Sequence, residues 1–184
     1  LSQGGAVIVG IIDRVGGLIN TKGYSFHEIK QLIEKRTGNF LESEDIISHK
    51  TVNEKIWSIG TDIFVPAAAS RLLEKNQLDT MINNGLEVIS SGANVPFADK
   101  EIFFGPIAKS ADKRISVLPD FIANCGMARA FSYFMQDNCE IKDITIFDAV
   151  SKTIKEALVE VYEENNSKTN ISKTAFQIAL KQLL

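Results

Sequence analysis

Short runs of apolar, β-branched residues alternate along the chain with longer segments whose apolar positions recur every three or four residues. This alternation is typical of an α/β fold, in which helices cover both faces of a parallel sheet. A strand that is covered on both faces is apolar throughout, so residues 7–12 (VIVGII) predict a buried parallel strand. The same reasoning predicts strands at residues 62–65, 86–90 and 115–118.

Helices are expected between and after these strands. Ser25 and Glu28 have the spacing of a capping box, and Thr37-Gly38 ends the helix that it starts. Gly16, Gly17 and residues 20–23 predict turns. Further helical patterns cover residues 67–73, residues 98–108 with an interruption at Gly105-Pro106, residues 121–135 entered through Asn124, residues 150–161, and the chain from residue 171 to the end, after a polar loop at residues 163–170.

The composition of the chain argues against several classes of function. A chain of 184 residues with 45% hydrophobic residues forms an ordinary globular core. Its 20 Lys and Arg against 23 Asp and Glu give a net charge of -3, which argues against a nucleic-acid partner. No apolar run reaches the roughly 20 residues that span a membrane. Cys125 and Cys139 fit reduced thiols of a cytoplasmic protein, and with only His27 and His49 besides them no metal site is expected.

Ligands of open parallel sheets bind beyond the carboxyl ends of the strands, which draws attention to the residues there. Asp13 follows the first strand, where a carboxylate can accept hydrogen bonds from an adenosine ribose, or can cap its own turn. Arg14 could pair with a 2′-phosphate, so both nicotinamide cofactors are open, with NAD favoured over NADP.

Three polar residues follow the later strands, and each has a second interpretation. Asn94, after Gly92, can bridge the ribose or carboxamide of a cofactor, or form an Asx-turn before Pro96. Asn124 can contact a cofactor or cap a helix. Asp120 can be a general base or a carboxylate at the start of a helix. Neither a Ser-His-Asp arrangement nor a GxGxxG turn is present in the sequence.

Four segments of the chain, taken together, resemble the cofactor-binding domain of the glutamate/leucine/phenylalanine/valine dehydrogenases. The most specific is Val117-Leu-Pro-Asp-Phe-Ile-Ala-Asn-Cys-Gly126 with Ser132-Tyr-Phe134, which looks like the family's strand, PD, AN-x-G and SYF pattern. The others are Ser91-Gly-Ala-Asn-Val-Pro96, Thr61-Asp-Ile-Phe-Val-Pro-Ala-Ala68 and the glycine-containing stretch of residues 12–23. They occur in the family's order.

The resemblance implies a Rossmann-like parallel sheet with helices on both faces over residues 1–142, without its first strand and glycine-rich turn, and a helical extension over residues 143–184 that packs on it. It implies that an L-amino acid is oxidatively deaminated to a 2-oxo acid and ammonia, with hydride passing to NAD or NADP, in a homo-oligomer. The composition adds the expectation of a cytoplasmic protein without nucleic-acid or membrane partners. The catalytic lysine and aspartate are expected in an N-terminal domain outside this chain, so that the chain alone is inactive.

For individual positions, the resemblance implies that Asp13 holds the adenosine ribose and that Pro66, Ala67 and Ala68 line the cofactor. Asn94 would contact the nicotinamide half, Asn124 would lie near nicotinamide and substrate, and Ser132 would face the substrate side chain.

The chain departs from the family pattern near the expected substrate. It has one glycine, Gly126, where the family usually has two, and Met135-Gln136 replaces an acidic-aromatic pair. Two other functions therefore stay open. One is a dehydrogenase of leucine, valine or phenylalanine, and the other is a non-catalytic nucleotide-binding or interaction module.

Overall fold

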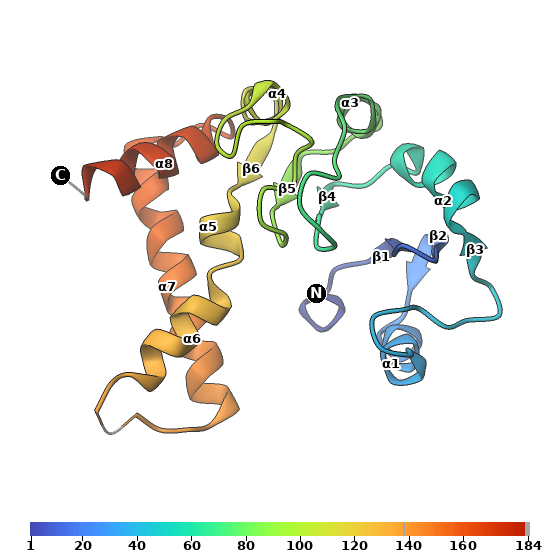
Figure 1. Ribbon diagram of the computed structural model, residues 1–184, viewed down its shortest axis with the longest axis horizontal. Helices are drawn as coiled ribbons and strands as arrows, with labels where there is room; N and C mark the ends of the chain where they lie inside the picture. The colour runs from blue at the N-terminus through green and yellow to red at the C-terminus, as the bar shows by residue number, and fades with distance from the viewer. Residues whose placement is uncertain (138, 183–184) are drawn as a thin grey trace. The chain divides into compact units, whose positions relative to one another are not determined.

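The computed structural model describes residues 1–137 and 139–182. The chain divides into two compact units, each with its own three-stranded sheet in the part that is described (Figure 1). The first unit contains residues 1–61 and 79–85, and the second contains residues 62–78 and the chain from residue 86 onward. This mixture of sheets and helices confirms the α/β class.

The sheet of the first unit is antiparallel, with the order β1–β2–β3. The prediction of a parallel strand buried on both faces at residues 7–12 is therefore wrong, and every residue of β1 is only half-buried. The chain reverses because Asp13 Oδ1 accepts hydrogen bonds from the backbone N–H groups of Val15 and Gly16, which stabilises a tight turn. The strands are β1 (Ile8–Ile12), β2 (Gly16–Tyr24) and β3 (Ile47–Ser48).

The glycines that predicted turns lie inside β2 instead. A Cβ at Gly17 would lie 2.6 Å from the carbonyl oxygen of Ile11, so the close pairing of β1 with β2 requires glycine at this position. The turn predicted after Asn20 is present as an irregularity in the strand, where Asn20 Nδ2 donates to the Gly23 carbonyl at 2.8 Å. The turn signals thus mark a bulge and not a strand end.

The capping box at Ser25 and Glu28 is confirmed. The Glu28 N–H donates to Ser25 Oγ at 3.3 Å, and the Ser25 N–H donates to the Glu28 carboxylate at 2.6 Å. The helix that follows buries none of its residues, whereas the next helix buries Val52 completely. These helical elements are η1 (Ser2–Gly4), α1 (Phe26–Lys35), α2 (His49–Lys55) and η2 (Ile56–Ser58).

The sheet of the second unit is parallel, with β4, β5 and β6 side by side in that order (Figure 1). The three later strands of the sequence prediction are thus confirmed, although each is shorter than expected. Ile89 in the central strand is fully buried, and Val117 in the neighbouring strand is nearly so. The strands are β4 (Ile63–Phe64), β5 (Val88–Ser90) and β6 (Ser116–Leu118).

Residues 67–73 form turns and not the predicted helix. The N–H of Arg71 donates to the Val95 carbonyl, and the N–H groups of Leu72 and Leu73 both donate to the Pro96 carbonyl. These amide groups are therefore used in long-range bonds and are not available to a helix. The helix begins only afterwards, as α3 (Lys75–Asn83).

The predicted helix at residues 98–108 begins only at Pro106, which suits the first position of a helix because its missing N–H has no partner there in any case. The nearly buried Asp99 carboxylate accepts hydrogen bonds from Ile107 N and Ala108 N, both at 2.9 Å. Asp99 thus caps the helix α4 (Pro106–Asp112) from the preceding loop.

Residues 121–135 form two helices where one was predicted. These are α5 (Asp120–Ala123) and α6 (Gly126–Phe134). Asn124 directly follows α5, and Cys125 is the N-cap of α6, so the predicted helix entry through Asn124 is wrong. The break places Asn124 in the link between two helices that follow β6 along the chain.

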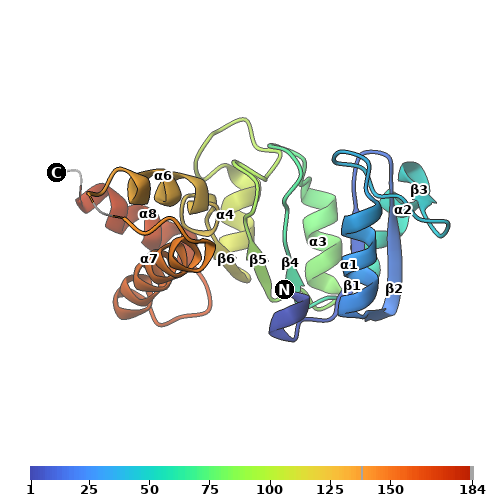
Figure 2. The same cartoon turned by 90° about the horizontal axis from the view of Figure 1, so that it is seen from below.

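The two C-terminal helices are confirmed as α7 (Asp143–Glu164), which begins earlier than predicted, and α8 (Ile171–Lys181). The last part of the second predicted helix, residues 183–184, lies outside the described residues. The long helix α7 runs between α6, which packs along one end of it, and α8, which packs at the other end, and Figure 2 views this arrangement from below. Val161 and Ala175 pack with Ile122 of α5 in one buried cluster. In the described residues no helix is long and apolar enough to cross a membrane.

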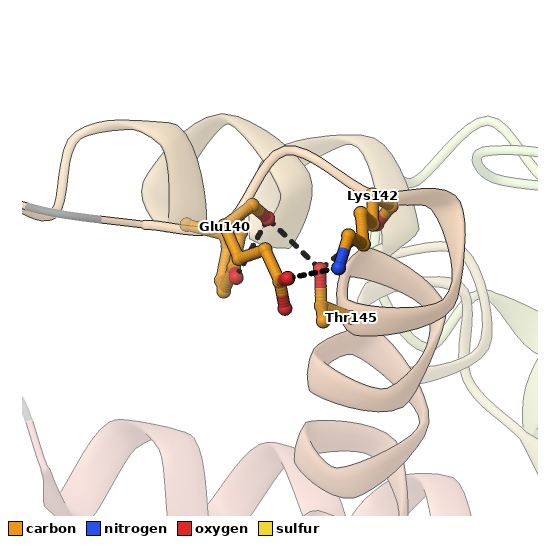
Figure 3. A network of polar contacts seen from close by, with 4 residues as sticks. Glu140, Lys142 and Thr145 are labelled. Carbon is orange, nitrogen blue, oxygen red and sulfur yellow. Dashed lines mark hydrogen bonds and ion pairs between the residues drawn. The ribbon is translucent and has the colours of Figure 1, made fainter.

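The start of α7 is fixed by the carbonyl oxygen of Glu140. This oxygen accepts hydrogen bonds from Thr145 Oγ1 at 2.8 Å and from the Tyr133 hydroxyl at 3.0 Å. Thr145 Oγ1 also lies 2.9 Å from the Lys142 carbonyl, and the Lys142 ammonium pairs with the Glu140 carboxylate (Figure 3). These contacts connect the end of α6 to the first turn of α7.

The first turn of α8 is anchored to β6 and α4. Ser172 Oγ donates to the carbonyl of Val117 at 2.7 Å, and the Ser172 and Lys173 N–H groups donate to the Asp112 carboxylate at 2.8 and 3.0 Å. Asp112 is 2% exposed. Burial raises the pKa of Asp112, although the two backbone hydrogen bonds and the Lys173 charge partly offset that rise.

Candidate functional site

The loop that follows β5, residues 91–97, is held between the ends of the other two parallel strands. Ser91 N–H donates to the Leu118 carbonyl at the end of β6, at 3.1 Å. Ala93 N–H donates to the Pro66 carbonyl after β4, at 2.7 Å. A Cβ at Gly92 would lie 3.2 Å from the Ala67 Cβ, so a small residue lets these two loops approach closely. The carboxyl ends of the three parallel strands therefore meet in one layer of loops.

The resemblance places Pro66, Ala67 and Ala68 against a cofactor, and the structure places them in this layer. Ala67 and Ala68 are exposed, while Pro66 supplies the carbonyl that holds the neighbouring loop.

Asn94 and Asn124, predicted separately from two different strand ends, lie in direct contact. Asn124 Nδ2 donates to Asn94 Oδ1 at 2.9 Å, and both residues are exposed. The bond leaves Asn94 Nδ2, a donor, and Asn124 Oδ1, an acceptor, outside the pair. A primary carboxamide, which offers one acceptor and one donor, has the hydrogen-bonding groups that complement these two atoms.

Asp120 uses its carboxylate for the backbone. Oδ2 accepts a hydrogen bond from Val95 N at 2.7 Å, and Oδ1 accepts one from Phe121 N at 2.9 Å. The structure therefore supports the helix-start interpretation of Asp120, with the addition of a bond to the loop after β5.

Backbone strain is concentrated around the same loops. Among the described residues, four non-glycine residues have a positive φ, and three of them lie here: Arg71 (60°), Val95 (46°) and Phe104 (52°). Such conformations persist only where surrounding contacts hold them, and they gather at functional sites. Arg71 supplies part of that support, because its guanidinium donates to the carbonyls of Asp99 and of Lys100, the latter at 2.8 Å.

Asp13 and Arg14 belong to the first unit, and both have partners there. Besides its turn, Asp13 accepts a hydrogen bond from Leu41 N at 2.7 Å through Oδ2. Burial alone would raise the pKa of Asp13, but these backbone bonds and the nearby His49 lower it below its usual value. The Arg14 guanidinium lies over the Phe40 ring, 4.4 Å from its centre.

Ser132 lies in α6 with an exposed side chain. In the described chain no group of three or more His, Cys, Asp or Glu residues could hold a metal ion. Sequence reasoning missed Arg71, because its role depends on pairing with a loop more than twenty residues away. The contact of Asp120 with Val95 was missed for the same reason, although the residue itself had been singled out.

Comparison with known proteins gives the family. The model of the Glutamate/Leucine/Phenylalanine/Valine dehydrogenase family matches residues 1–184. An NADP-specific glutamate dehydrogenase of Psychrobacter sp. (strain TAD1) is 22% identical over 164 residues, which cover 88% of this chain and 35% of that protein. An NAD-specific glutamate dehydrogenase A of Halobacterium salinarum is 26% identical over 137 residues, covering 73% of this chain and 28% of that protein.

The fold agrees. A structure of Plasmodium falciparum glutamate dehydrogenase 2 superposes with a TM-score of 0.66 at 18% identity, covering 97% of this chain and 41% of that one. The chain thus spans about a third of the length of the curated relatives that it matches. On the match over all of its residues, the chain belongs to the Glutamate/Leucine/Phenylalanine/Valine dehydrogenase family.

Proposed function

We propose that this chain is the cofactor-binding part of an NAD(P)-dependent amino acid dehydrogenase. The overall reaction converts an L-amino acid, water and NAD(P)+ into a 2-oxo acid, ammonium, NAD(P)H and a proton. L-glutamate is the favoured substrate, because the named relatives are glutamate dehydrogenases. The dehydrogenases of leucine, valine and phenylalanine are the alternatives within the family.

The observation that carries the proposal is the contact between Asn94 and Asn124 at the ends of two parallel strands. The nicotinamide carboxamide offers one carbonyl acceptor and one NH2 donor. Asn94 Nδ2 would donate to that carbonyl and Asn124 Oδ1 would accept from that NH2, which would fix the orientation of the ring. When bound, the nicotinamide accepts the hydride from the amino acid.

We propose NAD over NADP. Burial would raise the pKa of the Asp13 carboxyl, but hydrogen bonds from backbone N–H groups and the nearby His49 lower it below its usual value, which favours the charged form. If Asp13 meets the adenosine ribose, as the family resemblance implies, that charge repels a 2′-phosphate and accepts hydrogen bonds from free hydroxyl groups. Arg14, engaged with Phe40, is the residue that would favour NADP, so Asp13→Ser is expected to shift the preference toward NADP.

We further propose that this chain binds the cofactor without turning over substrate, as a cytoplasmic protein that assembles into a homo-oligomer. Asp99 and Asp120, the carboxylates of the loop layer, are both engaged by backbone N–H groups, which leaves them poorly suited to proton transfer. Ser132 would face the substrate side chain.

The test has two arms. The 184-residue chain is titrated with NADH and with NADPH, and the product of the full reading frame is assayed with glutamate, leucine, valine and phenylalanine, each with NAD and NADP. Dinucleotide binding by the chain and reduction of a cofactor by the full product are expected. If no amino acid reduces either cofactor, the dehydrogenase proposal fails. Turnover by the chain alone would overturn only the proposal of inactivity.

A second candidate function, an interaction module, is favoured by one face of α7. Phe147, Val159 and Tyr162 are 68%, 46% and 66% exposed on this face, where they flank Ser151 and Lys155. Large apolar side chains grouped on one exposed face are typical of interfaces. A start codon near Leu1 together with self-association and no dinucleotide binding would favour this function. An upstream GxGxxG and a lysine-bearing domain would favour the enzyme.

A further inference from the structure

We propose that Asp120 is a positioning residue for the pair Asn94 and Asn124, and that it acts by holding Val95 in a left-handed backbone conformation. The proposal deepens the function above and rests on it, since the pair is taken to orient the nicotinamide carboxamide. Asp120 itself touches neither cofactor nor substrate in this account.

Asp120 is bonded to Val95, which follows Asn94, and to Asn124 itself. Its carboxylate accepts a hydrogen bond from Val95 N, which is the peptide group that directly follows Asn94, at 2.7 Å. Its carbonyl oxygen accepts a hydrogen bond from Asn124 N, also at 2.7 Å. The bond to Val95 depends on the Asp120 side chain, whereas the bond to Asn124 is the backbone bond that ends α5, so a substitution of Asp120 removes the first and keeps the second.

Val95 needs this support. Its φ is 46°, in the left-handed region that β-branched side chains strongly disfavour. Both of its backbone polar groups are held, the N–H by Asp120 and the carbonyl by the N–H of Arg71 at 2.8 Å. A hydrogen bond to a charged carboxylate is among the stronger ones in proteins, so it can balance a strained φ.

Without the carboxylate, Val95 is expected to relax toward a negative φ. That rotation would turn the peptide that joins Val95 to Asn94 and move Asn94 Oδ1 away from Asn124 Nδ2. The pair would then lose the fixed donor and acceptor on which carboxamide binding depends. Part of the binding free energy would be used to restore their positions, so the affinity for the cofactor would be lower.

The test compares Asp120→Ala with Asp112→Ala. Asp112 is the matched control, because its carboxylate also accepts two backbone N–H groups but belongs to the junction of α4 and α8. Asp112→Ala is expected to lower the melting temperature more than Asp120→Ala, since Asp112 is the more buried. Asp120→Ala is expected to weaken NADH binding about tenfold, whereas Asp112→Ala leaves it within twofold.

A readout without ligand accompanies the titration. In 1H–15N spectra of the free chain, the side-chain amide signals of Asn94 and Asn124 are expected to move in Asp120→Ala and to stay in place in Asp112→Ala. If Asp120→Ala does not fold, Asp120→Asn, which keeps one acceptor oxygen, takes its place with a smaller shift of the same signals expected.

Rescue separates positioning from a general loss of structure. Glycine adopts a positive φ without strain, so Val95→Gly added to Asp120→Ala is expected to recover at least threefold of the lost affinity. Unchanged amide signals and unchanged affinity in Asp120→Ala overturn the inference, and so does a double variant that recovers nothing. A wild-type chain that binds neither NADH nor NADPH overturns the proposed function, while moved amide signals would still show that Asp120 positions the pair.

Discussion

The two units of the chain use buried and half-buried carboxylates in opposite ways. In the first unit, Asp13 stabilises a turn at the surface, and the three backbone N–H groups around it lower its pKa. In the second unit, Asp112 also accepts backbone hydrogen bonds, but its deep burial raises its pKa. The same side chain and the same kind of partner thus give opposite shifts, and the degree of desolvation decides the sign.

The units also differ in how they are stabilised. The first has few fully buried apolar side chains among its described residues, namely Leu18, Val52 and Met81. The second buries the centre of its parallel sheet together with the cluster of Ile122, Val161 and Ala175. We therefore expect the second unit to depend on its core and the first on the close approach of its strands.

The largest effect is expected in the core of the second unit. Ile89→Ala removes a fully buried side chain from the central strand and should lower the free energy of unfolding by about 2–4 kcal/mol. Ile33→Ala on exposed α1 is the control, with a change below about 0.5 kcal/mol. Urea unfolding followed by circular dichroism measures both. Equal losses of unfolding free energy in Ile89→Ala and Ile33→Ala would show that the second unit does not depend on its buried core.

A smaller loss is expected from Gly17→Ala in the first unit. The new methyl group would lie 2.6 Å from the Ile11 carbonyl oxygen, so the two strands must separate, at a cost of about 1–3 kcal/mol. Gly4→Ala is matched to it, because a Cβ at Gly4 meets nothing within 4 Å. A Gly17→Ala protein as stable as Gly4→Ala would show that strand approach does not stabilise this unit.

The pH dependence of Asp112 follows from the direction of its shift. Because the folded state raises the pKa of this carboxyl, the folded state binds the proton more tightly than the unfolded state does. Its stabilising contribution is full below the usual value of 3.8 and is lost as the pH rises through the raised value. The melting temperature of the wild type is therefore expected to fall relative to Asp112→Asn over that range.

For Asp13, stability is expected to change with pH in the opposite direction, and this effect is expected to be the smallest of those described. Its pKa is lowered on folding, so its contribution is full above the usual value of 3.8 and is lost as the pH falls through the lowered value. Any advantage of the wild type over Asp13→Asn at pH 6 should therefore shrink in acid. Melting temperatures between about pH 2 and pH 6 measure it, and a difference that grows in acid would contradict the assignment.

Local signals in the sequence predicted local structure well. Ser25 and Glu28 form the capping box, and three apolar runs form the parallel strands. The resemblance pointed to Asn94 and Asn124 as neighbours of the same cofactor, and the structure brings them into contact. The capping box and the strands share one cause, since each depends on a few adjacent residues or on the fixed geometry of a parallel sheet, while the roles of the two asparagines toward a cofactor stay predictions.

The failures have two causes. The residues of the segment 67–73 favour a helix, but the N–H groups of Leu72 and Leu73 bind the Pro96 carbonyl, so no helix forms. Gly16 and Gly17 predict a turn, but they allow a second strand to pair closely with β1. The Pro96 carbonyl lies more than twenty residues from Leu72 and Leu73, so no neighbouring residue identifies it, whereas Gly17 faces the carbonyl oxygen of Ile11 in the adjacent strand of a local hairpin.

The contact of Ser172 with β6 has a consequence for association between chains. β6 is an outer strand of its sheet, and the Val117 carbonyl points away from β5 because Ser116 N and Leu118 O bond on the β5 side. Ser172 already donates to that carbonyl, and α8 begins beside it. An extended peptide that pairs with β6 would need a hydrogen bond to the Val117 carbonyl, which Ser172 already occupies. The outer edge of β6 is therefore protected from pairing with a strand of another chain, which is a step that leads to aggregation.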